Sequence, residues 1–274
     1  MTRRGRPALH RLHRLLLLFL LFTAACATSP LHFEQSIVLL GEVHDNAAQH
    51  ALRLRAFEAW LAQGARPALV LEQLDRGRQA DIDRLRAQTP PPDADALIAA
   101  AGGPGWDWAF YRPFIALALR HGLPIVAANV SREEARQVMR DGLLATGFDP
   151  AVPPDLLDLQ ARDIEDSHCG MLDAPTARRM ALAQVARDQA LAAAVQRQAA
   201  GAVQLLAGNG HVRTDAGVPR WLTPAVRART QAIGLLEEGR TESGQFDRVL
   251  RTAAQPRPDP CAALRGPRDG PAAR

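Results

Sequence analysis

Two Gly-x-x-His segments carry the residue types and the spacing that chemistry most often needs. The first runs from Gly41 to His44 and the second from Gly208 to His211, and each follows a short apolar run. Glycine permits the tight turn and the close backbone approach that a ligand site requires. Imidazole changes its charge near neutral pH and is a frequent metal ligand. The paired motifs therefore predict a site that binds a ligand or moves protons.

Two carboxylates accompany these histidines. Glu42 lies inside the first motif, and Glu72 directly follows the apolar run at residues 67–71. Histidine with carboxylate supplies the ligands of metal sites and the acid–base groups of hydrolases. Taken singly, such a histidine usually ties loops together, and such a glutamate usually caps a helix or forms an ion pair.

The elements that must position these residues alternate between strands and helices. Short apolar runs predict strands at residues 36–40, 67–71, 124–130 and 203–207, with two more at 232–236 and 246–250. Helical spacing predicts helices at residues 47–63, 76–88, 108–121, 156–167 and 175–200, and a capping box of Ser131 with Glu134 begins another. This order predicts an α/β fold, with a mainly parallel central sheet flanked by helices and a smaller helical part. In such a sheet Glu42, His44, Glu72 and His211 would emerge at the same carboxyl edge.

The first residues form a targeting signal. Residues 3–14 are basic, and an apolar run leads from there to small residues directly before Cys26. This pattern is typical of a secretory signal at residues 1–25, and its end resembles a lipobox with Cys26 as the lipidated residue. Residues 26–35 would form a lipidated tether, and Ala27 favours the periplasmic side of the outer membrane. A plain cleaved signal with an incidental cysteine is the alternative.

Net charge and cysteine content limit the functions open to the rest of the chain, where the α/β domain is expected over residues 36–255. Five arginines lie in the first 25 residues, which contain no acid, so removing them from the net charge of +4 leaves about −1. A near-neutral domain gives no electrostatic case for nucleic acid. Cys169 and Cys261 are permitted to pair in an oxidising compartment. Because Cys261 lies in a Pro/Arg-rich tail at residues 256–274 that is predicted to be disordered, the disulfide stays an open question.

Several separate motifs give the chain a resemblance to the ChaN family of haem-binding lipoproteins, within a superfamily that includes Tiki proteins and erythromycin esterases. The resemblance runs from about residue 37 to residue 222. Its motifs are LLGEVHDN (39–46), LVLEQ (69–73), WDWAFYRPF (106–114), PIVAANV (124–130), DSHCGML (166–172), QVARDQALA (184–192) and LLAGNGHVR (205–213). It implies haem bound as a cofacial pair across a homodimer, with tyrosine on the iron. Tyr111, the only tyrosine, is then the expected donor.

Other residues fit the haem interpretation. Five aromatic residues crowd into residues 106–114 and offer an apolar surface, with Arg112 beside them for a propionate. The alternative is that this stretch is a helix packed on the sheet. His44, His168 and His211 are further candidate haem ligands. Gln184, Arg187 and Asp188 share one helix face, where Arg187 either completes the polar site or belongs to a solvated surface.

Three functions follow from these observations. The favoured one is an outer-membrane lipoprotein that binds haem for acquisition or storage without turnover. The second is a metal-dependent hydrolase or protease in which Glu42, His44, Glu72 and His211 hold a divalent ion or activate water. The third is a structural lipoprotein with a vestigial site.

Overall fold

Six parallel strands form the sheet around which the described chain folds. The computed structural model describes residues 31–239, 244–259, 261 and 262. Within them the strands stand in the order β3-β2-β4-β1-β5-β6, and every neighbouring pair is parallel. The strands are β1 (Ile37–Leu40), β2 (Ala68–Asp75), β3 (Ile125–Asn129), β4 (Val203–Leu206), β5 (Thr230–Glu237) and β6 (Arg248–Thr252). The predicted parallel α/β fold is confirmed.

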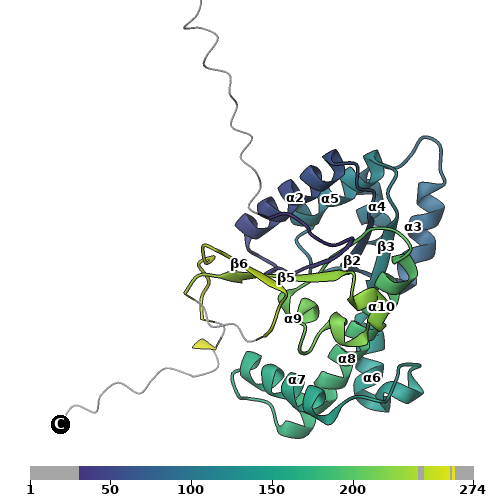
Figure 1. Cartoon of the computed structure of the whole chain (residues 1–274). Helices are drawn as coiled ribbons and strands as arrows, with labels where there is room; N and C mark the ends of the chain where they lie inside the picture. The colour runs from purple at the N-terminus through teal and green to yellow at the C-terminus, as the bar shows by residue number, and fades with distance from the viewer. Residues whose placement is uncertain (1–30, 240–243, 260, 263–274) are drawn as a thin grey trace, which may run out of the picture. The chain divides into compact units, whose positions relative to one another are not determined.

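Helices cover both faces of this sheet (Figure 1). One face carries α2 (Ala47–Ala62), α3 (Gln79–Arg86), α4 (Ala94–Ala101) and α5 (Trp108–Arg120). The other carries α8 (Ala174–Gln198), α9 (Asn209–Val212), α10 (Pro224–Arg227) and a 3₁₀ turn at Val218–Trp221, while a second 3₁₀ turn at Arg76–Arg78 leads into α3. Two further helices, α6 (Arg132–Ala145) and α7 (Pro154–Ser167), pack on α8 outside the sheet. They are the smaller helical part that the sequence predicted.

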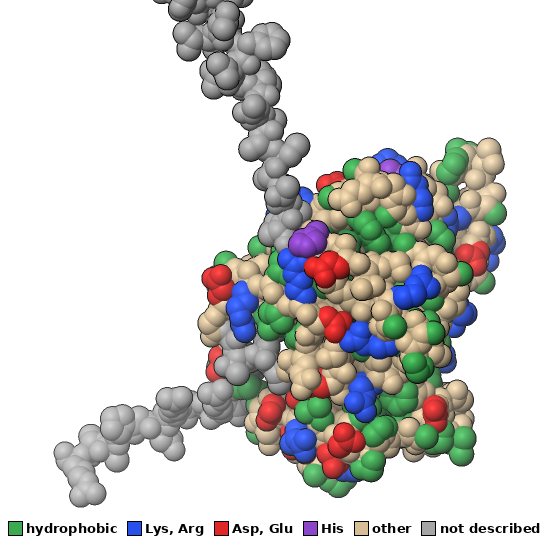
Figure 2. All heavy atoms as spheres, viewed as in Figure 1, with side chains coloured by type: hydrophobic (Ala, Val, Ile, Leu, Met, Phe, Trp, Pro, Cys, Tyr) green, Lys and Arg blue, Asp and Glu red, His purple; other side chains and the backbone are tan. Residues whose placement is uncertain are grey.

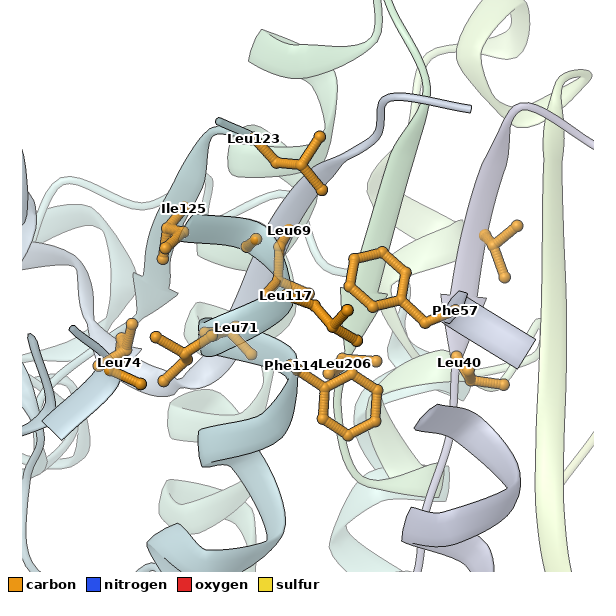
Figure 3. Packing of buried hydrophobic residues seen from close by; sticks show 14 of the residues in the cluster. Leu40, Phe57, Leu69, Leu71, Leu74, Phe114, Leu117, Leu123, Ile125 and Leu206 are labelled. Carbon is orange, nitrogen blue, oxygen red and sulfur yellow. The ribbon is translucent and has the colours of Figure 1, made fainter. Parts of the chain in front are cut away.

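Strand β1 shows why the sheet needs helices on both sides. Val38 and Leu40 belong to the core under α2 and α5, whereas Ile37 and Leu39 belong to the core under α8. Successive side chains of a strand point to opposite faces, so an unbroken apolar run is stable only where both faces are covered. In the first of these cores Phe57 of α2 and other aromatic and aliphatic side chains from α5 pack over the strands (Figure 3).

The helix starts follow the cap residues. Ser131 and Glu134 form the predicted capping box at the start of α6. The side chains of Asn46, Asp107 and Asp173 accept backbone N–H groups at the starts of α2, α5 and α8. These caps satisfy N–H groups that a helix leaves unpaired in its first turn.

Strand β2 is longer than the sequence indicated. It continues past Leu71 to Asp75 with a register shift on β3, so Glu72 lies within the strand rather than after it. The apolar run ends at Leu71, and sequence patterning gives no reason to extend a strand through polar residues. Glu72 is buried there because the folded chain supplies a partner, the N–H of Gly208, that the local sequence does not show.

The two ends of the chain are described only in part. The predicted signal at residues 1–25, Cys26 and the first half of the tether lie outside the described residues. Among the described residues no helix is long and apolar enough to cross a bilayer. At the other end Cys261 forms a disulfide with Cys169, which answers the question that the sequence left open.

Candidate ligand-binding site

The two Gly-x-x-His motifs meet at the carboxyl edge of the sheet. They follow the neighbouring strands β1 and β4, and the N–H of Asn209 donates to the carbonyl of Glu42 at 3.0 Å. A Cβ atom built on Gly208 would lie only 2.9 Å from Cε1 of His44 and 3.0 Å from its Nε2. The imidazole of His44 therefore rests on Gly208, and only glycine leaves it room there.

His44 forms a pair with Glu42. Its Nδ1 lies 2.7 Å from Oε1 of Glu42, and its side chain is 49% exposed. With the carboxylate as acceptor, Nδ1 of His44 donates to Glu42. The first motif thus presents an imidazole whose orientation is fixed by a carboxylate.

Glu42 itself is buried among compensating groups. It pairs with the buried guanidinium of Arg53, and the hydroxyl of Tyr111 donates to its Oε1 at 2.5 Å. Burial lowers the pKa of Arg53 to about 10, which still leaves it charged at neutral pH. Burial also raises the pKa of Tyr111, which keeps the phenol protonated, and lowers the pKa of the neighbouring His50. One cation and one phenol therefore hold the carboxylate that orients His44.

His211 lies between two acids. Its Nδ1 is 2.7 Å from Oδ1 of Asp188, and its Nε2 is 3.5 Å from Oε1 of Glu72. Burial opposes ionisation of this imidazole, but the two carboxylates outweigh it and raise the pKa of His211. For Glu72, burial is outweighed by His211 and His44, so its pKa is lowered, whereas burial raises the pKa of Asp188. The second motif thus carries an imidazole that lies between two carboxylates, which raise its pKa.

Two cavities adjoin these histidines. The α7 cavity, of about 850 Å³, lies between the strand ends and the helices α7 and α8. The α6 cavity, of about 640 Å³, lies between the strand ends, residues 103–106 and the start of α6. His44, Gln184 and His211 line both, so the two cavities meet at the paired motifs, and together we call them the cleft. Both volumes fall in the range of small-molecule and cofactor sites.

The cations of the two cavities differ in what they bind. In the α7 cavity Arg213 pairs with two aspartates, and Arg257 pairs with Asp45 and Glu237. In the α6 cavity Arg187 uses NH1 alone to donate to Asn129 and to a backbone carbonyl, which leaves its remaining N–H groups for a ligand. The α6 cavity is therefore the side of the cleft suited to an anionic group.

Three of the predicted site residues lie away from the cleft. Tyr111 is 1% exposed and its hydroxyl is engaged by Glu42, so it is not presented to a ligand. Arg112 is exposed and pairs with Asp95 at 2.6 Å. His168 bonds through Nδ1 to the carbonyl of Ile164 at the end of α7. None of the three lines either cavity, and the polar group of each is bonded to a partner elsewhere.

The aromatic stretch divides between packing and site. Phe114 is buried under the sheet, Trp108 donates to the carbonyl of Gly103, and Phe110 stacks on His50. Only Trp106 reaches the α6 cavity, where it meets His44 edge-on at 4.9 Å between ring centroids. The packing alternative therefore describes most of this stretch.

Two side chains that support the site were not predicted from sequence. His50 and Arg53 lie three residues apart on the buried face of α2, below the first motif. A polar pair on a helix face that also carries Phe57 is a signal that could have identified them. Asp188 was predicted only as part of a charged face, because nothing in its own segment points to His211.

The divalent-metal set is not assembled in the described part of the chain. No group of three or more His, Cys, Asp or Glu side chains there is placed to hold a metal ion. The internal cations explain this arrangement, because Arg53 engages Glu42 and His211 faces Glu72.

The fold and the cleft define an α/β protein with a ligand site beyond the carboxyl ends of parallel strands. Comparison with known proteins then identifies its family. The family model described as haem-binding uptake, Tiki superfamily, ChaN, matches residues 33–222. The chain belongs to this family.

Among the solved structures to which the chain is similar, one supports the fold. The chain is similar to ChaN of Campylobacter jejuni, a structure that describes cofacial haem binding, at 20% identity and a TM-score of 0.65, over 78% of this chain and 86% of that one. An erythromycin esterase mutant in its open conformation matches at 12% identity and a TM-score of 0.42, over 75% of this chain and 71% of that one. A succinoglycan biosynthesis protein matches at 14% identity and a TM-score of 0.46, over 74% of this chain and 66% of that one. No curated protein sequence matches.

Proposed function

We propose that this protein binds haem in the cleft and takes it up or holds it outside the cytoplasm. Membership of a family described by haem-binding uptake gives the ligand class. The observation that carries the proposal is the placement of His44, whose Nδ1 is held by a carboxylate while its half-exposed ring lines both cavities.

His44 would hold the haem iron in this proposal. Imidazoles that bind metals usually donate their second N–H to a carboxylate, which fixes the ring and raises its basicity. Glu42 supplies that partner, and Arg53 with Tyr111 fixes Glu42 in turn. Tyr111 thereby supports the ligand through Glu42 and does not bind the iron itself.

Both cavities offer side chains that would hold a porphyrin. Arg187, with Arg132 on the rim of the α6 cavity, offers charge to the propionates. The indole of Trp106 offers an apolar surface beside His44. Ile164 and Ala216 of the α7 cavity would add apolar contacts to the macrocycle.

A homodimer and a membrane anchor complete the proposal. Because His44 is half exposed, a haem held by it would remain accessible to a haem on a second copy of the chain, and covering both from solvent would favour a homodimer with a cofacial pair. Cys26, after its apolar run and small residues, carries the lipid that holds the protein at the periplasmic side of the outer membrane.

A haem titration of the purified protein, with metal analysis of the same sample, tests this function. We expect a saturable Soret band at about one haem per chain, and a mass by light scattering that doubles when haem is bound. A protein that gives no spectral change while holding a divalent ion contradicts the proposal.

The place of His211 between Asp188 and Glu72 supports a second candidate, hydrolysis. An imidazolium held by two carboxylates can donate a proton to a leaving group, and His44 can accept one from water. Ester cleavage that survives Tyr111→Phe but is lost in His211→Gln supports this candidate. Loss of that cleavage with a chelator favours the metal-dependent form.

A further inference from the structure

A short C-terminal segment crosses from the sheet to the helical part. We call it the strap: residues 253–259 with Cys261. At its start Asn46 donates to the carbonyl of Ala253 at 3.0 Å, and the N–H of Gln255 donates to Glu237 at 2.9 Å. At its end Cys261 is bonded to Cys169, just beyond the end of α7. The strap is thus attached to the strand-end loops on one side and to the helical part on the other.

The first attachment is ionic. Arg257 pairs with Asp45 after β1 and with Glu237 at the end of β5, where its NH1 lies 2.7 Å from Oε2. Hydrogen bonding to Arg257 lowers the pKa of Glu237 to about 2 and also lowers the pKa of Asp45. These carboxylates stay ionised well below neutral pH, so mild acid does not release Arg257.

The second attachment is covalent. Cys169 and Cys261 are both only half-buried, so a thiol has access to the bond. Thiol–disulfide exchange is the chemistry that opens such a bond without unfolding the protein. Of the two attachments, the disulfide is therefore the one that a mild chemical change can release.

The strap contributes Arg257 to the lining of the α7 cavity. Its partner Glu237 lines the same cavity, as do Gln160, Asp163 and Ser167 of α7. Ser167 is two residues from Cys169. A closed disulfide therefore ties the segment that carries Arg257 to the end of the helix that carries Ser167, and both of these residues line the cavity.

We propose that the strap is a gate on the α7 cavity and that the Cys169–Cys261 disulfide is its latch. A dithiol of the Cys-x-x-Cys type attacks one sulfur, and a second attack by its partner thiol leaves two protein thiols and an oxidised reagent. The strap then loses its covalent attachment and keeps the ion pairs of Arg257 and its hydrogen bonds to Asn46 and Glu237, so it opens and recloses locally. The identity of the gated ligand as haem rests on the proposed function, whereas the gate itself does not.

Chemical modification of His211 tests the gate without any haem. His211 lines the α7 cavity and its side chain is 13% exposed, while His121 is exposed outside the cleft and serves as the internal reference. Wild-type protein is reduced with a dithiol, its thiols are alkylated with iodoacetamide, and the reagent is removed. Diethyl pyrocarbonate is then added at pH 8, and the rate at each histidine is followed by mass spectrometry.

Reduction should raise the modification rate of His211 relative to His121 by about threefold or more. Arg257→Gln with the disulfide intact should stay within about twofold of wild type, because the covalent latch still holds the strap. Reduced Arg257→Gln should give the largest rate of the four samples. Equal rates before and after reduction in both proteins overturn the gate.

Haem association in Cys169→Ser/Cys261→Ser, without any reductant, links the gate to the ligand. We expect faster association than in oxidised wild type, with circular dichroism showing that the variant is folded. If the variant does not fold, the same measurement on reduced, alkylated wild type replaces it. If His211 reacts faster after reduction but no haem binds, the haem function is contradicted and the gate is supported. If haem binds at an unchanged rate and the reactivity of His211 is also unchanged, the gate is contradicted and the haem function is supported.

Discussion

Asp188 of α8 holds Nδ1 of His211 at 2.7 Å, on the side of the ring away from Glu72. Gln160 donates to the other oxygen of Asp188 at 3.1 Å, which fixes the carboxylate in turn. The proton on His211 is therefore set by a residue 23 positions away in the sequence.

Asp188→Asn should lower the pKa of His211, because it removes one of the two charges that raise it. A raised pKa in the folded state gives a stabilisation that is fully present below the unfolded value of about 6.5 and is lost as pH rises through the folded value. The variant should lose that pH-dependent part of the free energy of unfolding. Histidine NMR titration and urea unfolding between pH 5.5 and 9 measure both quantities.

The matched control for this change is Asp141→Asn, an exposed position outside both cavities. It should leave the titration of His211 and the pH profile unchanged. An unaltered His211 titration in Asp188→Asn would show that Glu72 alone holds the proton.

His44→Ala and Tyr111→Phe should separate the two candidate iron ligands. Loss of Nε2 in His44→Ala should abolish the Soret band that haem gives with wild type. Tyr111→Phe should keep the band and instead lower the free energy of unfolding by about 1.5–3 kcal/mol, the range for a hydrogen bond to a charged group. Absorption titration with haem and urea unfolding of both variants measure these effects. A Soret band that is lost only in Tyr111→Phe would show that Tyr111, and not His44, binds the iron.

Gly208→Ala should disturb the site more than the fold. The new methyl group would lie about 3 Å from the imidazole of His44 and 3.8 Å from Oε2 of Glu72, and the half-exposed imidazole can swing away. The backbone of Gly208 is one that alanine adopts, so the free energy of unfolding should change by less than about 1 kcal/mol. Haem affinity should fall by about tenfold or more, the effect of losing about 1.4 kcal/mol of ligand binding.

Gly201→Ala is the control for that variant. A Cβ there meets no atom within 4 Å, and the residue lines neither cavity. Its haem affinity should equal that of wild type. Equal losses of affinity in both variants would contradict a specific contact between Gly208 and His44.

Sequence patterning could predict the fold and the meeting of the two motifs because both follow from local periodicity. Apolar runs alternating with helical spacing require parallel strands covered on both faces, and such strands bring their carboxyl ends to one edge. Pairings between distant segments leave no such pattern. Asp188 meets His211, and Arg257 meets Asp45, only because the chain brings α8 and the strap to the strand ends.

The expectation for Tyr111 shows the limit more clearly. A tyrosine is chemically able to bind iron, and the sequence gives only the residue type at that position, not the direction of its side chain. Its direction is set by the helix α5, which turns the hydroxyl inward to Glu42. Only a structure gives that direction.

Glu42→Gln should be strongly destabilising, because it removes the partner of a fully buried cation. Both side chains are fully shielded from solvent, so the charge of Arg53 would be left without compensation, at a cost of about 3–5 kcal/mol in the free energy of unfolding. The double variant Glu42→Gln/Arg53→Met removes that charge as well and should recover part of the loss. Asp95→Asn, in an exposed pair with Arg112, should leave the unfolding midpoint unchanged. A double variant as unstable as the sum of its single changes would show that Glu42 is held by Tyr111 and His44 rather than by Arg53.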